Sequence, residues 1–425
     1  MTANPGGRRP LEDIRILDLT RHLAGAGSTR IMALLGAEVL RVEWPHLPAL
    51  DFLRLSGPNA DGIPGMNRSG FFAQINVHKK SIAIDLSTPR GQALLREFVP
   101  KCDIVVESFT PGVMKKWGLD YAGLKQLRED IIYVAASGFG HTGPYRDYRS
   151  VGPTAQAFAG LTAMVGMPGQ EPAGWGFSYM DHMGATMNAA AMLMALEKRR
   201  ATGRGEFIDG GQSQHGAALM GPMLLDAKLN GAKLEPQGNR DLYRNFSPAN
   251  TYRCQGEDRW VAITVRDEDD WLALCRVMNL GAFAAREELR TLPGRLAAQD
   301  EIDAAIAAWT AKRDRFAAMH ALQEAGVPAG VTQHADDKSE RDLQLASRSF
   351  YATVPDAVLG TKRYEGIPVV SDEFDTSVHT PSPWMGEHTR PVLREVLGYE
   401  DAAVDTLIAE KTIWETDLVR EVGAA

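Results

Sequence analysis

The chain has 425 residues, of which 44% are hydrophobic and 24% are charged, a composition typical of a soluble globular protein with room for two or three domains. Its net charge of -8 argues against nucleic acid or an anionic membrane as the main partner, although it leaves open a local basic groove for a phosphorylated ligand. No apolar stretch approaches the roughly 18 residues that a membrane span needs.

The first half of the chain alternates strand-like and helix-like patterns. Short, nearly continuous apolar segments predict strands over residues 14–20, 38–43, 81–86, 103–108 and 131–137. The segments 28–37 and 88–99 between them have the apolar spacing of helices. Buried strands that alternate with helices are typical of a parallel sheet covered on both faces, so the sequence predicts an α/β fold with a doubly wound sheet.

A change of pattern divides the chain into domains. A long apolar helix is predicted from Met180 to Arg200, with Gly203 and Gly205 as stop signals. An antiparallel pair (251–254 and 259–265) and helices at 268–278, 300–311 and 314–325 follow. We therefore expect a large α/β domain over residues 1–225, to which residues 336–425 return, and a smaller α+β domain over 226–335.

The segment GFGHTG (138–143) matches the glycine spacing of dinucleotide-binding loops. Such a loop should open a helix, but Pro144 to Tyr148 follow without an apolar helical period, and no acid lies about 20 residues further on where one is expected. We therefore interpret these glycines as places where the backbone passes close to a ligand or another chain.

Cysteine and histidine usage indicates neither disulfides nor a metal site. Cys102, Cys254 and Cys275 are far apart, which is typical of reduced thiols in the cytoplasm. The ten histidines show no metal-ligand spacing. The N-terminal segment has two arginines but no apolar run behind them, so we do not expect a secretory signal, and we expect a cytoplasmic protein.

Asp181 precedes a run of Ala, Gly and Met, and two interpretations of it are compatible. Asp is a preferred N-cap residue, so this acid can simply begin the helix. The helix dipole would also keep its carboxylate ionised, and the small Gly184 and Ala185 leave room beside it. An ionised carboxylate in a partly dry pocket can attack an acyl carbon.

Four basic residues fall near the carboxyl ends of predicted strands, where open α/β sheets bind ligands: Lys115, Lys116, Arg146 and Arg149. Each could be ordinary surface charge. Together they could bind phosphates.

Several segments together resemble the class III coenzyme A transferases, the CaiB/BaiF family, which includes formyl-CoA transferase. They occur in the family's order over almost the whole chain: LEDIRILDLTRHLAG (11–25), LLGAEVLRVEWP (34–45), HKKSIAIDLSTPRG (78–91), VVESFTPGVMKKWGLDY (105–121), IIYVAASGFGHTGPY (131–145), QAFAGL (156–161), YMDHMG (179–184), EKRRATGRGEFID (197–209) and MGEHTRPVL (385–393). Any one of these segments is weak, but the ordered set is specific.

The resemblance implies a Rossmann-like large domain built from both chain ends, a small domain between them, and two chains interlocked as a homodimer. It implies Asp181 as the catalytic residue, coenzyme A and acyl-CoA as substrates, and no permanently bound cofactor. The positions that match coenzyme A contacts are Leu23, Ala24, Trp44, Ile84, Asp85, Leu86, Ser87, Ser108, Phe109, Thr110, Lys116 and Arg149. Trp44 stands where the family often has an arginine that contacts coenzyme A, Ala26 replaces the usual proline, and Ser108 replaces a common asparagine, which is a milder change.

The function that the resemblance implies is reversible transfer of coenzyme A from an acyl-CoA to a free carboxylic acid through an aspartyl anhydride and an aspartyl-CoA thioester. Racemases of α-methylacyl-CoA share the fold but need a histidine in the segment that here is SVGPTAQ (150–156), which has none. A further alternative is a non-catalytic subunit of a heteromeric transferase.

The identity of the acid is left open by the sequence. The glycine-rich loop of oxalate-type members has no counterpart here, which favours an acid larger than oxalate. Tyr179, Met180, Met183 and Met187 suggest an adaptable apolar acyl site, although Met in a helix is more often core.

Overall fold

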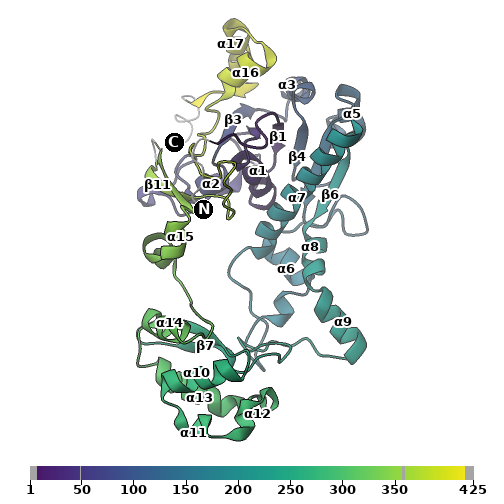
Figure 1. Cartoon of the computed structure of the whole chain (residues 1–425). Coiled ribbons are helices and arrows are strands. Elements are labelled where there is room, and N and C mark those ends of the chain that lie inside the picture. Colours follow the sequence, from purple (N-terminus) through teal and green to yellow (C-terminus); the bar gives the residue numbers. More distant parts are fainter. Residues whose placement is uncertain (1–6, 48, 357–358, 417–425) are drawn as a thin grey trace. The chain divides into compact units, whose positions relative to one another are not determined.

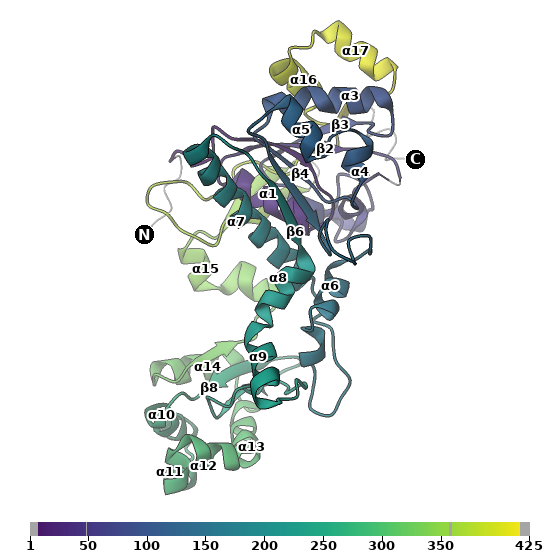
Figure 2. The same cartoon turned by 90° about the vertical axis from the view of Figure 1, so that its right-hand side faces the viewer.

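The computed structural model describes residues 7–47, 49–356 and 359–416 (Figures 1 and 2). Contacts within the chain divide it into two compact units. The larger unit contains the chain up to Thr162, residues 175–232 and the chain from Leu343 onward. The smaller unit contains Ala163–Gly174 and Lys233–Asp342, so it takes a short segment from the first half of the chain besides one long stretch.

The larger unit is built around a mainly parallel sheet. Among the described residues this sheet has seven strands in the order β12-β3-β2-β1-β4-β5-β6, and β12 alone of them runs antiparallel to its neighbour. The strands are β1 (Arg15–Leu19), β2 (Glu38–Glu43), β3 (Lys79–Ile84), β4 (Ile104–Glu107), β5 (Ile132–Ser137), β6 (Phe207–Gly211) and β12 (Ile413–Trp414). The predicted α/β fold with a parallel sheet is confirmed.

Helices cover both faces of this sheet, because successive residues of each buried strand point to opposite sides. Leu17 of β1 packs in one core with Leu94 and Val392, whereas Ile16 packs in the other with Met32 and Met192. The helices of the first face are α3 (Pro89–Phe98), α5 (Tyr121–Leu127), α16 (Thr389–Leu397) and α17 (Asp401–Ala409). Those of the second face are α1 (Ala24–Leu34) and α7 (Tyr179–Thr202), which lie side by side in Figures 1 and 2.

The larger unit also contains further helices and a hairpin. They are the helices α2 (Gly70–Ile75), α4 (Val113–Lys116), α6 (Gly152–Phe158), α8 (Gln212–Leu219), α9 (Gly221–Asn230) and α15 (Leu343–Ser347), and the hairpin of β10 (Tyr351–Asp356) and β11 (Gly360–Glu365).

The smaller unit has its own antiparallel sheet and its own core around Trp271. Its elements are β7 (Ala249–Arg253), β8 (Trp260–Thr264), α10 (Glu268–Met278), α11 (Gly281–Ala284), α12 (Leu292–Ala297), α13 (Gln299–Thr310), α14 (Arg315–Glu324) and β9 (Ala329–Val331). The expected antiparallel pair is confirmed as β7 with β8, and the three expected helices as α10, α13 and α14.

Helix α1 begins at Ala24, four residues before the predicted start at residue 28. The glycines of its first turns, which we expected in a loop, allow close packing. A Cβ atom on Gly27 would lie 2.8 Å from Cβ of Ala185 in α7, and one on Gly25 would lie 2.7 Å from the side chain of Thr20. Local propensity disfavours glycine in a helix, but here the tight contact between α1 and α7 outweighs it.

Candidate functional site

A cavity of about 550 Å³ lies at the carboxyl ends of β1, β4 and β5 in the larger unit. The chain proceeds from β1 to β2 and β3 on one side, and then returns to place β4 on the other side of β1. The loops after β1 and β4 therefore diverge there, which is where open α/β sheets bind ligands. The lining residues are Arg21–Gly25, Leu53, Phe71, Ser108–Pro111, Ala136–Phe139, Arg146, Tyr148–Gly152, Ser178, Asp181 and Gln212.

Asp181 lies in the first turn of α7, where it is the third helical residue. The N-cap interpretation is therefore wrong: the helix begins at Tyr179, the preceding Ser178 occupies the cap position, and no side chain caps the helix. The position still suits a carboxylate, because the helix dipole favours negative charge in the first turn. The side chain of Asp181 consequently lines the cavity instead of closing the helix end.

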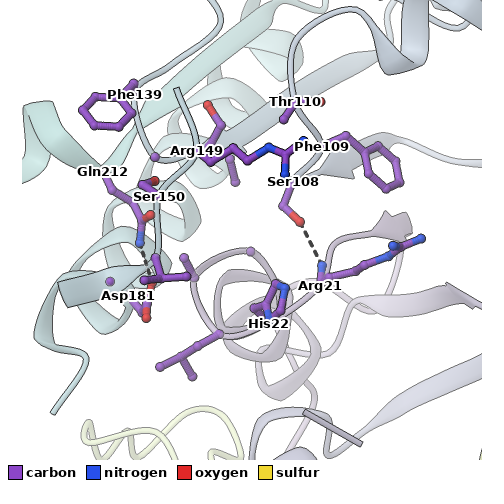
Figure 3. Close-up of a pocket in the computed structure, with 18 of the residues that line it drawn as sticks. Arg21, His22, Ser108, Phe109, Thr110, Phe139, Arg149, Ser150, Asp181 and Gln212 are labelled. Carbon is purple, nitrogen blue, oxygen red and sulfur yellow. Dashed lines mark hydrogen bonds between the residues drawn. The ribbon is translucent and has the colours of Figure 1, made fainter. Parts of the chain in front are cut away.

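One oxygen of the Asp181 carboxylate is fixed and the other is not. Gln212, the first residue of α8, donates from Nε2 to Oδ1 of Asp181 at 2.7 Å (Figure 3). Within the described part of the chain, Oδ2 accepts no hydrogen bond. It faces Gly152, where a Cβ atom would lie only 2.4 Å from Oδ2. The glycine therefore keeps a space beside the carboxylate that any other residue would fill.

Glu107, the last residue of β4, holds the loop that follows this strand. The backbone N–H of Phe109 donates to Oε2 of Glu107 at 2.5 Å, and the hydroxyl of Tyr133 donates to Oε1 at 2.9 Å. Burial raises the pKa of the Glu107 carboxyl to about 7, although both of these hydrogen bonds oppose the shift. On the cavity side, Ser108 accepts a hydrogen bond from the backbone N–H of Arg21 at 2.9 Å.

Gly138 and Phe139, at the start of the glycine segment 138–143, form another part of the cavity wall. Asp209 of β6 accepts a hydrogen bond from the backbone N–H of His141 at 2.7 Å and one from the Thr142 hydroxyl at 3.1 Å. Gly140 is left-handed, with φ +83°, and a Cβ atom on Gly138 would lie 1.6 Å from the Ser150 hydroxyl. Turns follow up to residue 150 in place of the helix that a dinucleotide loop would open. Gly138 is therefore required by the close approach of Ser150 and Gly140 by its left-handed backbone, whereas a contact of these glycines with a ligand or another chain stays a prediction.

The cavity is electropositive. Among its described lining residues Asp181 is the one carboxylate, whereas Arg21, Arg146 and Arg149 contribute three guanidinium groups. Arg146 pairs with the exposed Asp147 at 3.4 Å. Figure 3 shows the side chain of Arg149 extended toward Ser108 and Phe109. Such a cavity is suited to a ligand that carries negative charge.

The cavity brings together Asp181 and six of the predicted coenzyme A contacts: Leu23, Ala24, Ser108, Phe109, Thr110 and Arg149. The remaining predicted contacts lie outside its lining. Trp44, just after β2, stacks edge-on against Trp414 with ring centroids 4.4 Å apart. Lys116 is the exposed last residue of α4.

The segment 84–87 also lies outside the cavity lining, at the end of β3. Ile84 is buried and pairs with Ile413 of β12, and the backbone N–H of Asp85 donates to the Thr412 carbonyl at 2.9 Å. Oδ1 of Asp85 accepts a hydrogen bond from the Ser87 hydroxyl at 2.5 Å. Leu86 packs against the core.

The methionines near Asp181 do not form the apolar acyl site that the sequence suggested. Met180 is fully buried, and Tyr179, Met183 and Met187 are also absent from the described lining of the cavity.

Four residues of the site were missed by sequence reasoning: His22, Glu107, Gly152 and Gln212. Glu107 and Gln212 could have been found, because each stands at or just after the end of a strand in this sheet. Gly152 carries no local signal, since its role depends on a carboxylate about 30 positions further along the chain.

The described residues contain neither a metal-binding group of side chains nor a helix able to span a membrane. Within 7–47, 49–356 and 359–416, no group of three or more His, Cys, Asp or Glu side chains is arranged to hold a metal ion. No helix among these residues is both long and apolar enough to cross a membrane.

Comparisons with known proteins agree with one another. Residues 11–389 match the model of CoA-transferase family III. Succinyl-CoA–D-citramalate CoA-transferase of Chloroflexus aurantiacus is 32% identical over 95% of this chain and 98% of its own length. Succinate–glutarate CoA-transferase of Agrobacterium fabrum is 30% identical over 95% of this chain and its full length. The crystal structure of a CaiB/BaiF family protein from Brucella suis has a TM-score of 0.81 at 27% identity, over 91% of this chain and 99% of that one.

Proposed function

Because the chain belongs to CoA-transferase family III, we propose that it transfers coenzyme A from an acyl-CoA to a free carboxylic acid through a covalent intermediate on Asp181. The observation that carries this proposal is the geometry of the Asp181 carboxylate. Its Oδ1 is held by Gln212 while its Oδ2 faces open space beside Gly152. A carboxylate that is oriented by one oxygen and free at the other can act as a nucleophile.

The proposed reaction has four steps. Oδ2 of Asp181 attacks the thioester carbonyl, the carbon–sulfur bond breaks, and coenzyme A leaves as a thiolate, so that a mixed anhydride remains on Asp181. The thiolate attacks the aspartyl carbonyl of this anhydride and releases the first acid, which leaves an aspartyl-CoA thioester. The carboxylate of the second acid attacks this thioester and releases the thiolate again. The thiolate then attacks the acyl carbonyl of the second anhydride, which yields the new acyl-CoA and free Asp181.

Electrostatics support this sequence of anionic steps. Asp181 lies in the first turn of the 24-residue helix α7, where the helix dipole favours negative charge. Each addition to a carbonyl also develops an oxyanion, which backbone N–H groups stabilise most effectively in a site that excludes water. We propose the segment 138–139, which lines the cavity, as the source of such groups.

Coenzyme A carries phosphates, and the arginines at the cavity are suited to bind them. We propose Arg149 together with Ser108, Phe109 and Thr110 as contacts within the cavity. Trp44, the segment 84–87 and Lys116 remain proposed contacts for the outer part of coenzyme A. In support, Trp44 directly follows β2 and Ile84 is the last residue of β3. Both therefore lie at the same edge of the parallel sheet as the cavity.

The acyl groups are proposed to be dicarboxylic. The two curated relatives described above are named for succinyl-CoA or succinate, and for citramalate or glutarate as the second acid. All of these are dicarboxylic acids larger than oxalate. An electropositive cavity supports this choice, because a second carboxylate would otherwise be repelled by Asp181.

The assembly is proposed to be an intertwined homodimer, as the family resemblance implies. Exposed apolar side chains on α7 and α9 support an interface in the larger unit: Met194 is 68% exposed, Leu225 61% and Leu229 76%. Sedimentation should give a dimer that does not release folded monomers on dilution. A folded, active monomer of 46.4 kDa would contradict the homodimer, and a stable complex with a related subunit would favour a heteromer.

The proposed function is tested with succinyl-CoA and a panel of free acids. Formation of new acyl-CoA should follow ping-pong kinetics, and hydroxylamine should cleave an acyl or coenzyme A adduct at Asp181. Absence of transfer combined with exchange of the α-proton of a branched acyl-CoA would favour the racemase. Absence of both transfer and adduct would favour the non-catalytic subunit.

A further inference from the structure

His22 presents an imidazole to the cavity that the protein itself does not use. The residue lies in the loop between β1 and α1, is exposed, and lines the cavity. Among the described residues, neither ring nitrogen has a hydrogen-bond partner. The nearest aromatic ring recorded for it is that of Phe52, with centroids 6.4 Å apart and planes tilted by 42°. A free donor in a ligand cavity is available to a ligand.

The backbone of His22 is held in an unusual conformation. Its φ is +59°, in the left-handed region that residues other than glycine rarely occupy. Oδ1 of Asp51 accepts a hydrogen bond from the backbone N–H of His22 at 3.2 Å and another from Leu53 at 3.0 Å. Asp51 is itself buried and paired with the buried Arg41. A buried ion pair therefore supports a strained residue at the cavity wall, a combination that is typical of functional sites.

The other basic groups of the cavity lie elsewhere on its walls. Figure 3 shows His22 on the wall formed by the start of α1, between Asp181 and the side chain of Arg21. Arg149 extends toward the loop of Ser108 and Phe109, and the guanidinium of Arg21 lies 5.4 Å from the centre of the Phe109 ring. Arg21 and Arg149 are thus directed to the loop proposed to bind coenzyme A, and Arg146 pairs with Asp147, which leaves His22 as the basic side chain on the α1 wall.

We propose that His22 is a specificity-determining residue, which donates a hydrogen bond to the distal carboxylate of a dicarboxylic acyl substrate. This inference rests on the proposed function. A dicarboxylic acid that reacts at Asp181 brings a second negative charge close to the nucleophile. An imidazole N–H compensates that charge, and a monocarboxylic acid of the same length leaves the imidazole unused.

The test compares two acids of equal chain length, glutarate and pentanoate, as acceptors from succinyl-CoA. The variant His22→Asn retains a residue that tolerates left-handed backbone, but its shorter amide does not reach as far. We expect kcat/KM for glutarate to fall about tenfold to a hundredfold, as for the loss of a hydrogen bond to a charged group, and kcat/KM for pentanoate to stay within about twofold. His320→Asn, at an exposed histidine of α14 in the smaller unit, is the matched control and should change neither value.

Four outcomes would overturn the inference. An equal fall for both acids in His22→Asn would mean that His22 only maintains the cavity. If the wild type exchanges the α-proton of a branched acyl-CoA and His22→Asn does not, His22 acts as a base in that exchange. A wild type that transfers coenzyme A to no acid of the panel would overturn the proposed function as well, whereas unchanged selectivity in a working transferase would overturn the role of His22 alone.

Discussion

A buried ionic cluster on and beside β1–β3 and the cavity around Asp181 differ in how their carboxylates are hydrogen-bonded. We define the ionic cluster as Asp18, Arg41, Glu43, Asp51, Arg54 and Lys79, all of them buried. Oδ1 of Asp18 accepts from the backbone and the hydroxyl of Thr20, and Oδ2 accepts from Thr29 at 2.6 Å and Lys79 at 3.2 Å. Asp181 accepts from Gln212 at one oxygen and leaves the other free.

This difference separates what stabilises the fold from what we propose to perform the chemistry. Burial would raise the pKa of the Asp18 carboxyl, but Lys79 and Arg41 outweigh burial and hold it below its ordinary value. The Asp18 carboxylate therefore has no lone pair left for a ligand. The cluster nevertheless serves the site, because its member Asp51 holds the backbone of His22. The predictions below break one side of the comparison at a time.

The largest effect is expected from Asp181→Asn. The amide is a far poorer nucleophile, so the rate of transfer should fall by roughly four orders of magnitude or more. The fold should survive, since Asn can accept the bond from Gln212 and the charge in the first helical turn is worth only about 0.3–1 kcal/mol. Transfer assays and thermal melts on the same preparation test both parts. Near-normal turnover would show that the free carboxylate is not the nucleophile.

Lys79→Met should instead weaken the fold. It leaves Asp18 as a buried charge without its closest cation, which should reduce the free energy of unfolding by about 3–5 kcal/mol. Urea denaturation measures this loss, and the double variant Lys79→Met with Asp18→Asn should recover part of it. If the double variant were less stable than the single one, an uncompensated Asp18 charge would not be the reason for the loss.

Glu107 should make stability depend on pH in the neutral range. Burial raises its pKa in the folded protein to about 7 from an ordinary 4.5, so the unfolded chain loses this proton first as the pH rises. The favourable contribution of the buried, protonated Glu107 is complete below about pH 4.5 and is lost as the pH rises to about 7, a change of about 3 kcal/mol. Melting temperatures between about pH 5 and pH 8 should show this loss in the wild type and not in Glu107→Gln. The same dependence of melting temperature on pH in both proteins would show that Glu107 is not the group responsible.

The smallest effect is expected from Gly152→Ala. Its methyl group would displace Oδ2 of Asp181, and a misplaced nucleophile should slow transfer by about tenfold to a hundredfold. Gly221→Ala is the matched control, because Gly221 also begins a helix and precedes a proline, and nothing lies within 4 Å of its added Cβ atom. Equal rates in the two variants would mean that the space beside Asp181 is not needed.

Local patterns in the sequence sufficed for most elements of the sheet. Val105 and Val106, in the middle of β4, are buried on opposite faces, so their strand is apolar on both sides and easily recognised. The start of α1 was predicted four residues late, because glycine locally disfavours a helix, and the close packing of Gly25 against Thr20 and of Gly27 against Ala185 is a tertiary contact. The predicted cap role of Asp181 was wrong because α7 begins two residues earlier, at Tyr179. Sequence signals do not locate the start of a helix to within two residues.

The sequence by itself determined the parallel sheet and the antiparallel pair of the smaller unit, because these depend on the order and spacing of residues along the chain. Asp181 became the candidate nucleophile only through the resemblance to the family, since the residues around it left a helix cap equally open. The tertiary structure alone decided that Gln212 holds Asp181, that Gly152 keeps space beside it, and that Asp51 maintains the left-handed backbone of His22. These contacts join residues about 30 positions apart on different elements. Their distances depend on how helices and strands pack, which no local pattern of residue types encodes.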